Sequence, residues 1–175
     1  MFRTKASQAF TELILEVFRS NGRLLSAGDA LTRPVGQTSA RWQILGALDE
    51  GALTVADIGR RMGLTRQSVQ RTADLLESDG LLSYADNPAH QRAKLAKLTP
   101  RGEMTLEAIT SRQIEWANRV AGSLAETDLK GAIRTLRQVR EALERSAVSS
   151  EPTVGRRLRG TPAGTKPKAK RGRAS

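Results

Sequence analysis

Apolar residues recur at intervals of three and four along the start of the chain, which is the spacing of one face of an α-helix. This pattern predicts a long helix over roughly residues 5–32, and Pro34 and Gly36 are expected to end it. The apolar positions of this helix are Ala6, Ala9, Phe10, Leu13, Ile14, Val17, Leu24, Ala27 and Leu31.

Three shorter helices are predicted next, at about residues 39–50, 55–62 and 66–78, each begun by a threonine that can cap it. The second begins with the segment Thr54-Val-Ala-Asp57, which has the spacing of a capping box with aspartate in place of the usual Glu or Gln. Glycines follow these helices and are expected to end them. The apolar residues of the first two are Trp42, Leu45, Leu48, Val55, Ile58 and Met62.

A β-hairpin is predicted after these helices, because the turn-forming segment Asp86–Gln91 separates two segments that can form short strands, 81–85 and 92–98. The alternation in the second strand is imperfect.

Two final helices are expected over about 100–122 and 128–147. The apolar positions of the first are Met104, Ala108, Ile109, Trp116 and Val120. This order predicts a mainly α fold with a small β-wing, the plan of a winged helix-turn-helix.

The helix expected over 66–78 divides into two faces. At about 100° per residue, its apolar residues gather on one side and its long polar residues on the other. The apolar side is Val69, Thr72, Ala73 and Leu76, and the polar side is Gln67, Gln70, Arg71, Asp74 and Ser78. Arg to guanine and Gln to adenine are pairings that read base edges in the major groove of DNA. An ordinary amphipathic helix with a solvated face is the alternative interpretation.

Basic residues beside this helix favour the DNA interpretation. Arg60 and Arg61 precede the helix. Arg92, Lys94 and Lys97 belong to the hairpin. Positive charge is therefore expected on both flanks, where phosphates would run. The residues expected to contact double-stranded DNA are Arg66, Gln67, Ser68, Gln70, Arg71, Arg92 and Lys94.

Composition narrows the possible functions. The chain has 175 residues, a formal net charge of +11, no cysteine and one histidine, His90. Disulfides, thiolate chemistry and Cys-based zinc sites are therefore excluded, and neither a metal site nor a Ser-His-Asp triad is expected. Without a phosphate loop or a nucleophile elbow, we expect neither an enzyme nor a cofactor. Without a long apolar run or a signal-peptide segment, we expect a cytoplasmic protein that does not enter membranes.

Residues 149–175 form a basic tail with eight Lys or Arg residues and one acid. Three prolines, four glycines and two large aliphatic residues leave little to bury, so this tail is expected to be disordered. It either adds phosphate contacts on nucleic acid or merely keeps the protein soluble.

Several segments of the chain, in this order and spacing, resemble the MarR (multiple antibiotic resistance regulator) family of transcription factors. They are Trp42-Gln-Ile-Leu-Gly-Ala-Leu48, Ile58-Gly-Arg-Arg-Met-Gly-Leu-Thr-Arg-Gln-Ser-Val-Gln-Arg71, Leu75-Leu-Glu-Ser-Asp-Gly-Leu-Leu82, Asn87-Pro-Ala-His-Gln-Arg-Ala-Lys-Leu95 and Leu98-Thr-Pro-Arg-Gly102. The resemblance covers about residues 5–147 and leaves the basic tail outside.

This resemblance implies a homodimer in which residues 1–148 form one winged-helix domain. The helices over about 5–32 and 100–147 would join the two copies, and the lobe over about 38–99 would bind DNA. Two such lobes imply a pseudo-palindromic operator whose half-sites lie about one helical turn, ~34–36 Å, apart.

The wing tip departs from the family's pattern. Arg92 matches an arginine that commonly enters the minor groove, whereas His90 stands where Asp is common and Gln91 where a basic residue is common. An exposed loop histidine is expected to be merely solvated. If Gln91 has replaced a phosphate contact, the basic tail would compensate for it.

The resemblance also implies a small, often aromatic ligand that binds in a cleft and releases the protein from DNA by shifting its population of conformers. The residues expected there are Phe10, Phe18, Trp42, Met62 and Trp116, with Arg41 as a partner for a carboxylate. Core packing is the alternative for each apolar residue, and Arg41 would equally suit a contact with the DNA backbone.

Other functions stay open at this point. A non-specific architectural DNA-binding protein would use the basic tail, but the polar residues Gln67, Gln70 and Arg71 favour sequence reading. An RNA-binding protein would need aromatic residues for base stacking, and the chain has only two Trp, one Tyr and three Phe. We therefore expect a sequence-specific transcriptional regulator, and within that class a repressor.

Overall fold

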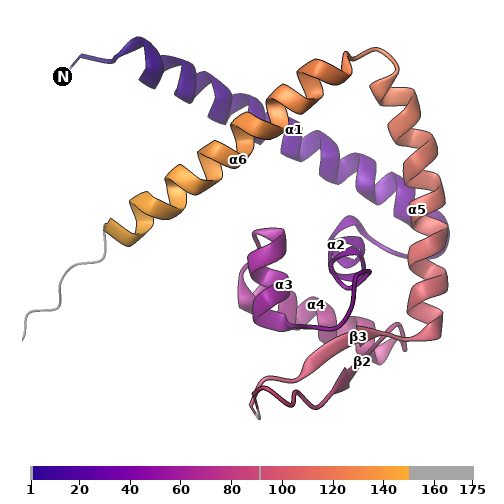
Figure 1. Cartoon of the computed structure of the whole chain (residues 1–175). Helices are drawn as coiled ribbons and strands as arrows, with labels where there is room; N and C mark the ends of the chain where they lie inside the picture. Colours follow the sequence, from indigo (N-terminus) through magenta and orange to yellow (C-terminus); the bar gives the residue numbers. More distant parts are fainter. Residues whose placement is uncertain (1, 91, 150–175) are drawn as a thin grey trace, which may run out of the picture. The chain divides into compact units, whose positions relative to one another are not determined.

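The computed structural model describes residues 2–90 and 92–149, and the chain divides into two compact units, residues 1–124 and 125–175. Within the described residues, the first unit holds helices α1 to α5, a short 3₁₀ helix and a small sheet (Figure 1). Its elements are α1 (Lys5–Thr32), η1 (Arg33–Val35), α2 (Ser39–Ala47), β1 (Leu53–Thr54), α3 (Val55–Met62), α4 (Arg66–Ser78), β2 (Leu82–Ala85), β3 (Leu95–Leu98) and α5 (Pro100–Ala121). The second unit holds α6 (Glu126–Ser149). The expected disorder of the basic tail concerns residues almost all outside the described ones.

Threonine hydroxyls cap the helices where the sequence predicts them, each accepting a hydrogen bond from the backbone N–H three residues later. These caps are Thr38, Thr54, Thr65 and Thr99. The predicted capping box of α3 takes a different form, because the Asp57 carboxylate accepts a hydrogen bond from the Thr54 hydroxyl at 2.5 Å. This bond, with the nearby Arg60 guanidinium, lowers the pKa of Asp57 below its ordinary value of 3.8.

The predicted hairpin is present and gains a third strand. β2 and β3 pair antiparallel, and β1, a two-residue strand that was not predicted, pairs with β3 to give the order β1-β3-β2. The turn is longer than predicted, because the His90 N–H donates to the Asn87 carbonyl and the Ala93 N–H donates to the His90 carbonyl, each at 3.1 Å. β3 therefore begins at Leu95 rather than near residue 92.

The core of the first unit lies where α2, α3, α4 and α5 pack together with the sheet. Its largest fully buried apolar side chains are Ile44, Leu45, Ile58, Val69, Leu76, Leu82 and Ile109. On α5, two of the apolar positions expected from the sequence are not in the core: Met104 is 64% exposed and Val120 is 46% exposed. Met104 lies about half a turn from the buried Leu106, so it faces away from the lobe.

The bounds of two helices, α2 and α6, differ slightly from the prediction. α2 ends at Ala47 rather than near residue 50, because the chain turns there and the Gly51 N–H donates to the Leu48 carbonyl at 3.1 Å. α6 begins earlier and ends later than predicted. No helix in the described part of the chain is long and apolar enough to cross a membrane.

Candidate nucleic-acid interface

The turn between α3 and α4 is defined by a glycine in the left-handed region and by backbone hydrogen bonds. Gly63 has a φ of +66°, in the left-handed region that favours glycine, and the Leu64 N–H donates to the Gly59 carbonyl at 2.9 Å. A Cβ on Gly59 would lie 2.9 Å from the Leu64 carbonyl oxygen, so a larger residue would push the turn away. The Thr65 hydroxyl then caps α4 by accepting the Ser68 N–H at 3.2 Å. Together these contacts build the predicted helix-turn-helix.

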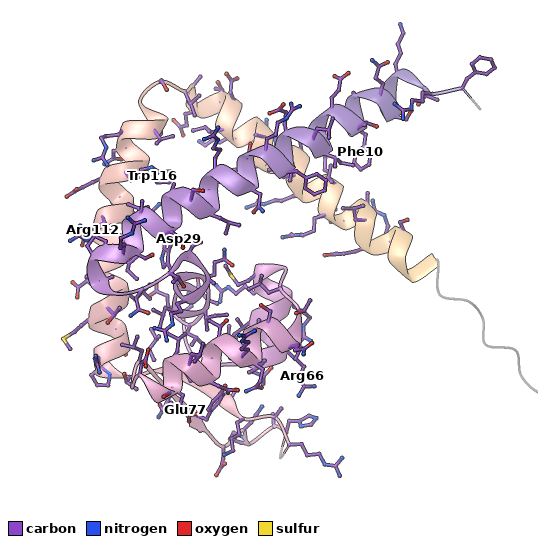
Figure 2. The ribbon with its side chains drawn as sticks, turned by 180° about the vertical axis from the view of Figure 1, so that it is seen from behind. Phe10, Asp29, Arg66, Glu77, Arg112 and Trp116 are labelled. Atoms are coloured by element: carbon purple, nitrogen blue, oxygen red, sulfur yellow. The ribbon has the colours of Figure 1, made fainter. Side chains whose placement is uncertain are left out.

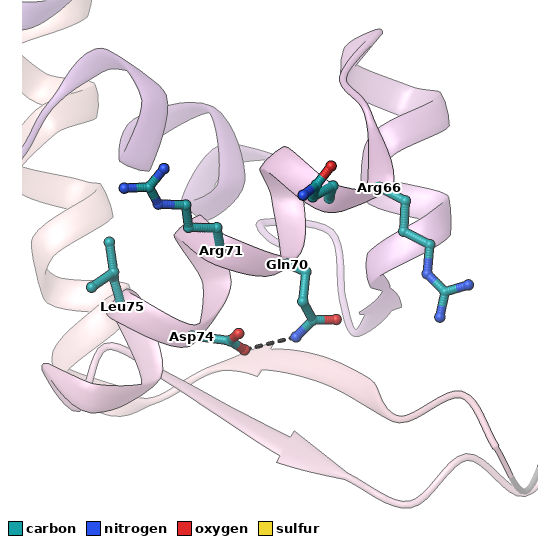
Figure 3. A pocket seen from close by; sticks show the side chains of 6 residues that line it. Arg66, Gln70, Arg71, Asp74 and Leu75 are labelled. Atoms are coloured by element: carbon teal, nitrogen blue, oxygen red, sulfur yellow. Dashed lines mark hydrogen bonds between the residues drawn. The ribbon is translucent and has the colours of Figure 1, made fainter.

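α4 has one buried face and one exposed polar face, which confirms the predicted division. Val69, Ala73 and Leu76 are each 0% exposed. The polar face borders a shallow cavity of about 870 Å³, lined by Arg66, Gln67, Gln70, Arg71, Asp74 and Leu75. Figure 3 shows the Arg66 side chain extending on one side of Gln70 and Arg71 on the other. Hydrogen-bond donors and acceptors therefore lie on the outer surface of α4, with Leu75 exposed beside them.

A second cavity, of about 920 Å³, lies between the wing and the beginnings of α3 and α4. Four exposed basic side chains line it: Arg60 from α3, Arg66 from α4, and Arg92 and Lys94 from the wing. The acidic residue among its lining residues, Asp57, forms an ion pair with Arg60. Positive charge therefore borders the polar face of α4 on the side of the wing, and the N-terminal end of α4 adds the positive end of its dipole.

Two basic residues that the sequence places beside α4 make other contacts. Arg61 forms an ion pair with Glu50 and donates to the Ala47 carbonyl at 3.2 Å. Lys97 lines a separate cavity of about 640 Å³, beside β3 and α5, together with three acidic residues. Neither lines the basic cavity of the wing. Gln91, where the wing departs from the family's pattern, lies outside the described residues.

Gln70, Asp74 and Tyr84 form a hydrogen-bonded cluster between α4 and β2. The Gln70 amide Nε2 donates to Asp74 Oδ1 at 2.7 Å and to Tyr84 Oη at 3.2 Å, and the Tyr84 hydroxyl donates to Asp74 Oδ1 at 3.3 Å. Burial, and then the Asp74 carboxylate, raise the pKa of Tyr84 to about 12. Sequence reasoning missed Tyr84, although strand alternation puts it on the same face as the buried Leu82 and so towards α4.

The apolar residues expected to bind a small effector are spread over the first unit. Trp42 and Met62 are partly buried against the core of the lobe. Phe10 and Phe18, on α1, are 39% and 69% exposed. Figure 2 shows Phe10 far along α1 from Trp116, which is half-buried on α5. None of these residues lines any of the three cavities described above.

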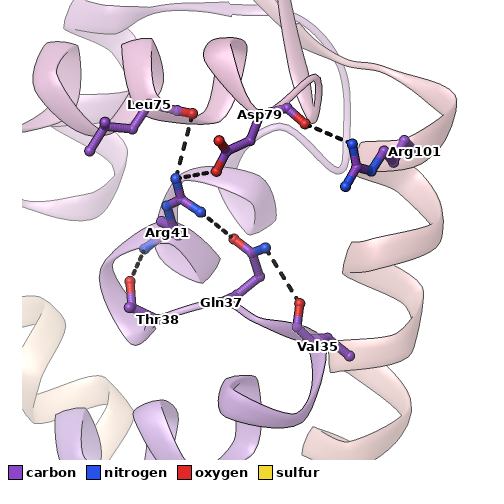
Figure 4. Close-up of polar contacts among 7 residues, drawn as sticks. All are labelled: Val35, Gln37, Thr38, Arg41, Leu75, Asp79 and Arg101. Atoms are coloured by element: carbon purple, nitrogen blue, oxygen red, sulfur yellow. Dashed lines mark hydrogen bonds and ion pairs between the residues drawn. The ribbon is translucent and has the colours of Figure 1, made fainter.

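Arg41, the residue expected to meet an effector carboxylate, already has protein partners. Its Nη2 lies 2.5 Å from Asp79 Oδ2 and 3.5 Å from the Leu75 carbonyl oxygen, and its Nη1 donates to Gln37 Oε1 at 3.2 Å (Figure 4). The side chain is 18% exposed. In this structure Arg41 therefore joins α2 to the C-terminal end of α4.

Comparison with known proteins places this geometry in a family. Residues 35–93 match a family model described as MarR family. The chain is 38% identical over 138 residues to an uncharacterized protein of Mycobacterium bovis, a match that covers 79% of this chain and 96% of the relative.

Two solved structures share the fold at lower identity. The Mycobacterium tuberculosis transcriptional regulator MOSR, solved in complex with DNA, has a TM-score of 0.64 at 23% identity over 74% of this chain and 96% of its own. CouR from Rhodococcus jostii, solved bound to p-coumaroyl-CoA, has a TM-score of 0.66 at 22% identity over 73% of this chain and 90% of its own. With the winged lobe matched by the family model and the fold shared with such regulators, this chain belongs to the MarR family of transcription regulators.

Proposed function

We propose that the protein is a homodimeric, sequence-specific DNA-binding repressor that reads a pseudo-palindromic operator with α4. The observation that carries this proposal is the polar face of α4 beside a cavity lined by four exposed basic side chains. The polar side chains suit direct reading of base edges, and the basic ones suit the phosphate contacts that position a reading helix. The MOSR structure in complex with DNA supports this use of the fold.

The proposed roles follow from the position of each side chain. We assign Arg66, Gln67, Ser68, Gln70 and Arg71 to the major groove, because they occupy the N-terminal half of α4 and are exposed. Arg92 and Lys94 extend the contact along the DNA from the wing. The double-stranded DNA partner needs no cofactor in this scheme.

The homodimer is supported by exposed apolar side chains on helices outside the DNA-binding lobe. On α1, Phe18 and Leu24 are 69% and 57% exposed. On α6, Ile133 and Leu143 are 48% and 56% exposed. Apolar stripes along long helices are costly in water unless a partner covers them, and a second copy joined by a two-fold axis would cover them. Light scattering is expected to give the mass of a dimer.

We further propose that a small aromatic ligand releases the protein from DNA. CouR, solved with p-coumaroyl-CoA bound, supports such a ligand for this fold. Trp42 and Met62 are the members of the expected effector set that pack against the core of the lobe, and Phe10, Arg41 and Trp116 would complete a site only with rearrangement or with a second copy. A ligand carboxylate at Arg41 would have to replace Asp79.

A non-specific architectural DNA-binding protein is the second candidate function. The observation in its favour is the basic tail, with eight basic residues and one acid in residues 149–175. Such a protein would bind all sequences alike, mainly through phosphates.

Selection of bound sequences from a random DNA pool separates the two functions. The matched variant carries Gln67→Ala, Gln70→Ala and Arg71→Ala, which removes base-reading side chains and keeps the tail and the four basic side chains that line the second cavity. The wild type is expected to enrich a pseudo-palindrome with half-sites about 34–36 Å apart, and the variant to enrich none. Enrichment of no motif by the wild type would favour the architectural function.

A reporter gene placed behind the selected sequence tests for repression. Its expression is expected to fall when the protein is present, and a rise in expression would make the protein an activator.

A further inference from the structure

The side-chain nitrogen of Gln70 has two hydrogen-bond partners within the protein. A glutamine amide has two donors on its nitrogen and one acceptor oxygen. Here Nε2 lies 2.7 Å from Asp74 Oδ1 and 3.2 Å from Tyr84 Oη, so its two hydrogens have two acceptors within hydrogen-bond distance. Figure 3 shows the amide nitrogen turned towards Asp74 and the oxygen turned away from it.

The chemistry of the two partners fixes this orientation. An ionised carboxylate only accepts hydrogen bonds, so the amide nitrogen rather than the oxygen must face Asp74. The Tyr84 hydroxyl donates its own hydrogen to Asp74 Oδ1 at 3.3 Å, which leaves its oxygen as an acceptor for Gln70. Because the pKa of Tyr84 is raised to about 12, this hydroxyl stays protonated at neutral pH.

Only the carbonyl oxygen Oε1 of Gln70 is then available to DNA. We propose that Asp74 and Tyr84 are positioning residues that present Gln70 to the major groove as a pure acceptor, so that Gln70 reads an exocyclic amino group, adenine N6 or cytosine N4. This inference rests on the proposed function, and it replaces the two-bond contact to adenine that glutamine makes when its amide is free.

The proposal specifies which bases are accepted at one position of each half-site. In the major groove adenine and cytosine each offer an amino donor, whereas guanine offers only acceptors and thymine an acceptor and a methyl group. An acceptor-only Gln70 should therefore treat adenine and cytosine alike and discriminate against guanine and thymine. A free glutamine amide would prefer adenine alone, because it would also donate to adenine N7.

The test measures the affinity of four proteins for every single-base variant of the selected operator: the wild type, Gln70→Ala, Tyr84→Phe and the Tyr84→Phe/Gln70→Ala double variant. The base pair at which Gln70→Ala abolishes discrimination identifies the position that Gln70 reads. At that position the wild type is expected to bind adenine and cytosine within about threefold of each other, and both about tenfold more tightly than guanine or thymine.

Tyr84→Phe removes the hydroxyl and frees one N–H of Gln70. Adenine is then expected to gain about five- to tenfold over cytosine at this position only, and the double variant should lose that gain. Ser78→Ala is the matched control, because Ser78 is exposed at the C-terminal end of the same helix and is not among the residues assigned to DNA; it should leave the adenine-to-cytosine ratio unchanged. If Tyr84→Phe lowers the yield of folded protein, Asp74→Ala gives the same readout from an exposed position of α4.

The outcomes separate this inference from the proposed function. A wild type without any sequence preference overturns both. A specific wild type that prefers adenine alone at the Gln70 position, that loses no discrimination in Gln70→Ala, or whose adenine-to-cytosine ratio is unmoved by Tyr84→Phe overturns the acceptor assignment and leaves the regulator intact.

Discussion

Arg41 Nη2 lies 2.5 Å from Asp79 Oδ2, and this ion pair fastens α2 to the residue that caps the C-terminal end of α4. Arg101, from α5, donates to the Asp79 carbonyl at 3.1 Å on the other side of the same residue. Figure 4 shows the two arginines converging on Asp79. Cations at a helix C-terminus satisfy carbonyl groups that have no partner within the helix. The C-terminal end of α4 is therefore held by two other helices, α2 and α5.

Arg41→Ala is expected to lower the free energy of unfolding by about 1–2 kcal/mol, because a mostly buried guanidinium loses bonds to Asp79 and Gln37. Arg60→Ala is the matched control, since the ion pair of Arg60 with Asp57 is largely exposed and should contribute less than about 0.5 kcal/mol. Urea unfolding of the wild type and of each variant, at one fixed protein concentration, measures both changes in the free energy of unfolding. Equal effects of the two variants would mean that Arg41 does not hold α4.

Gly102→Ala is expected to destabilise the protein by about 3 kcal/mol. A Cβ at this position would lie 2.0 Å from the carbonyl oxygen of Leu81, and that oxygen already accepts the Thr99 N–H at 3.2 Å. The beginning of α5 therefore cannot shift without breaking its contact with the sheet. Gly46→Ala, on α2, has nothing within 4 Å of the added Cβ, so this substitution should raise the free energy of unfolding by about 0.5–1 kcal/mol. Thermal or urea unfolding that ranks the two variants in the opposite order would contradict this packing.

Tyr84 is expected to ionise near pH 12 in the folded protein, about two units above its ordinary value of 10.0. Because the folded-state pKa is raised, the stability linked to Tyr84 is fully present below pH 10 and is lost as the pH rises from 10 towards 12. The chain has one tyrosine, so the ultraviolet absorbance of tyrosinate follows Tyr84 alone. Asp74→Ala should lower the midpoint in part, because burial is the larger cause and persists. A folded-state midpoint near 10 would show that Tyr84 is neither buried against α4 nor hydrogen-bonded to Asp74.

Lys94→Ala is expected to weaken DNA binding and to reduce the slope of log affinity against log salt concentration by about 1, as the loss of one phosphate contact should. Lys97→Ala is the matched control on the same hairpin. Its side chain lines the cavity beside α5 with three acidic residues, so the salt slope should not change. The titration is a fluorescence anisotropy series over several salt concentrations. Equal changes in the two variants would place the DNA on a different face of the wing.

Much of the fold could be predicted because it depends on local signals. Thr65 and Thr99 cap helices that begin where a threonine precedes an apolar repeat, and the buried face of α4 follows from helical periodicity alone. β1 could not be predicted in this way. Leu53–Thr54 is too short to show an alternation, and it is a strand only because β3 pairs with it.

The polar face of α4 could be predicted, but the partners of its side chains could not. Gln70 meets Tyr84 across 14 positions of sequence, and Arg41 meets Asp79 across 38. Both contacts depend on how separate elements pack, which periodicity does not encode. The same limit applies to Arg41, for which the sequence left open an effector carboxylate or the DNA backbone, and to Lys97, which it put on a flank of the reading helix. The ion pair of Arg41 with Asp79 and the acidic residues near Lys97 both come from other elements.

Binding of DNA from one defined source tests most directly whether this chain reads DNA sequence through α4. Fluorescence anisotropy should compare DNA from immediately upstream of the protein's own coding region with a shuffled fragment of equal length at about 150 mM salt. We expect a preference of about a thousandfold or more for the upstream fragment, retained when residues 149–175 are deleted. Equal, steeply salt-dependent binding to both fragments that disappears with the tail would contradict it, because the protein would then bind phosphates through its tail rather than bases through α4.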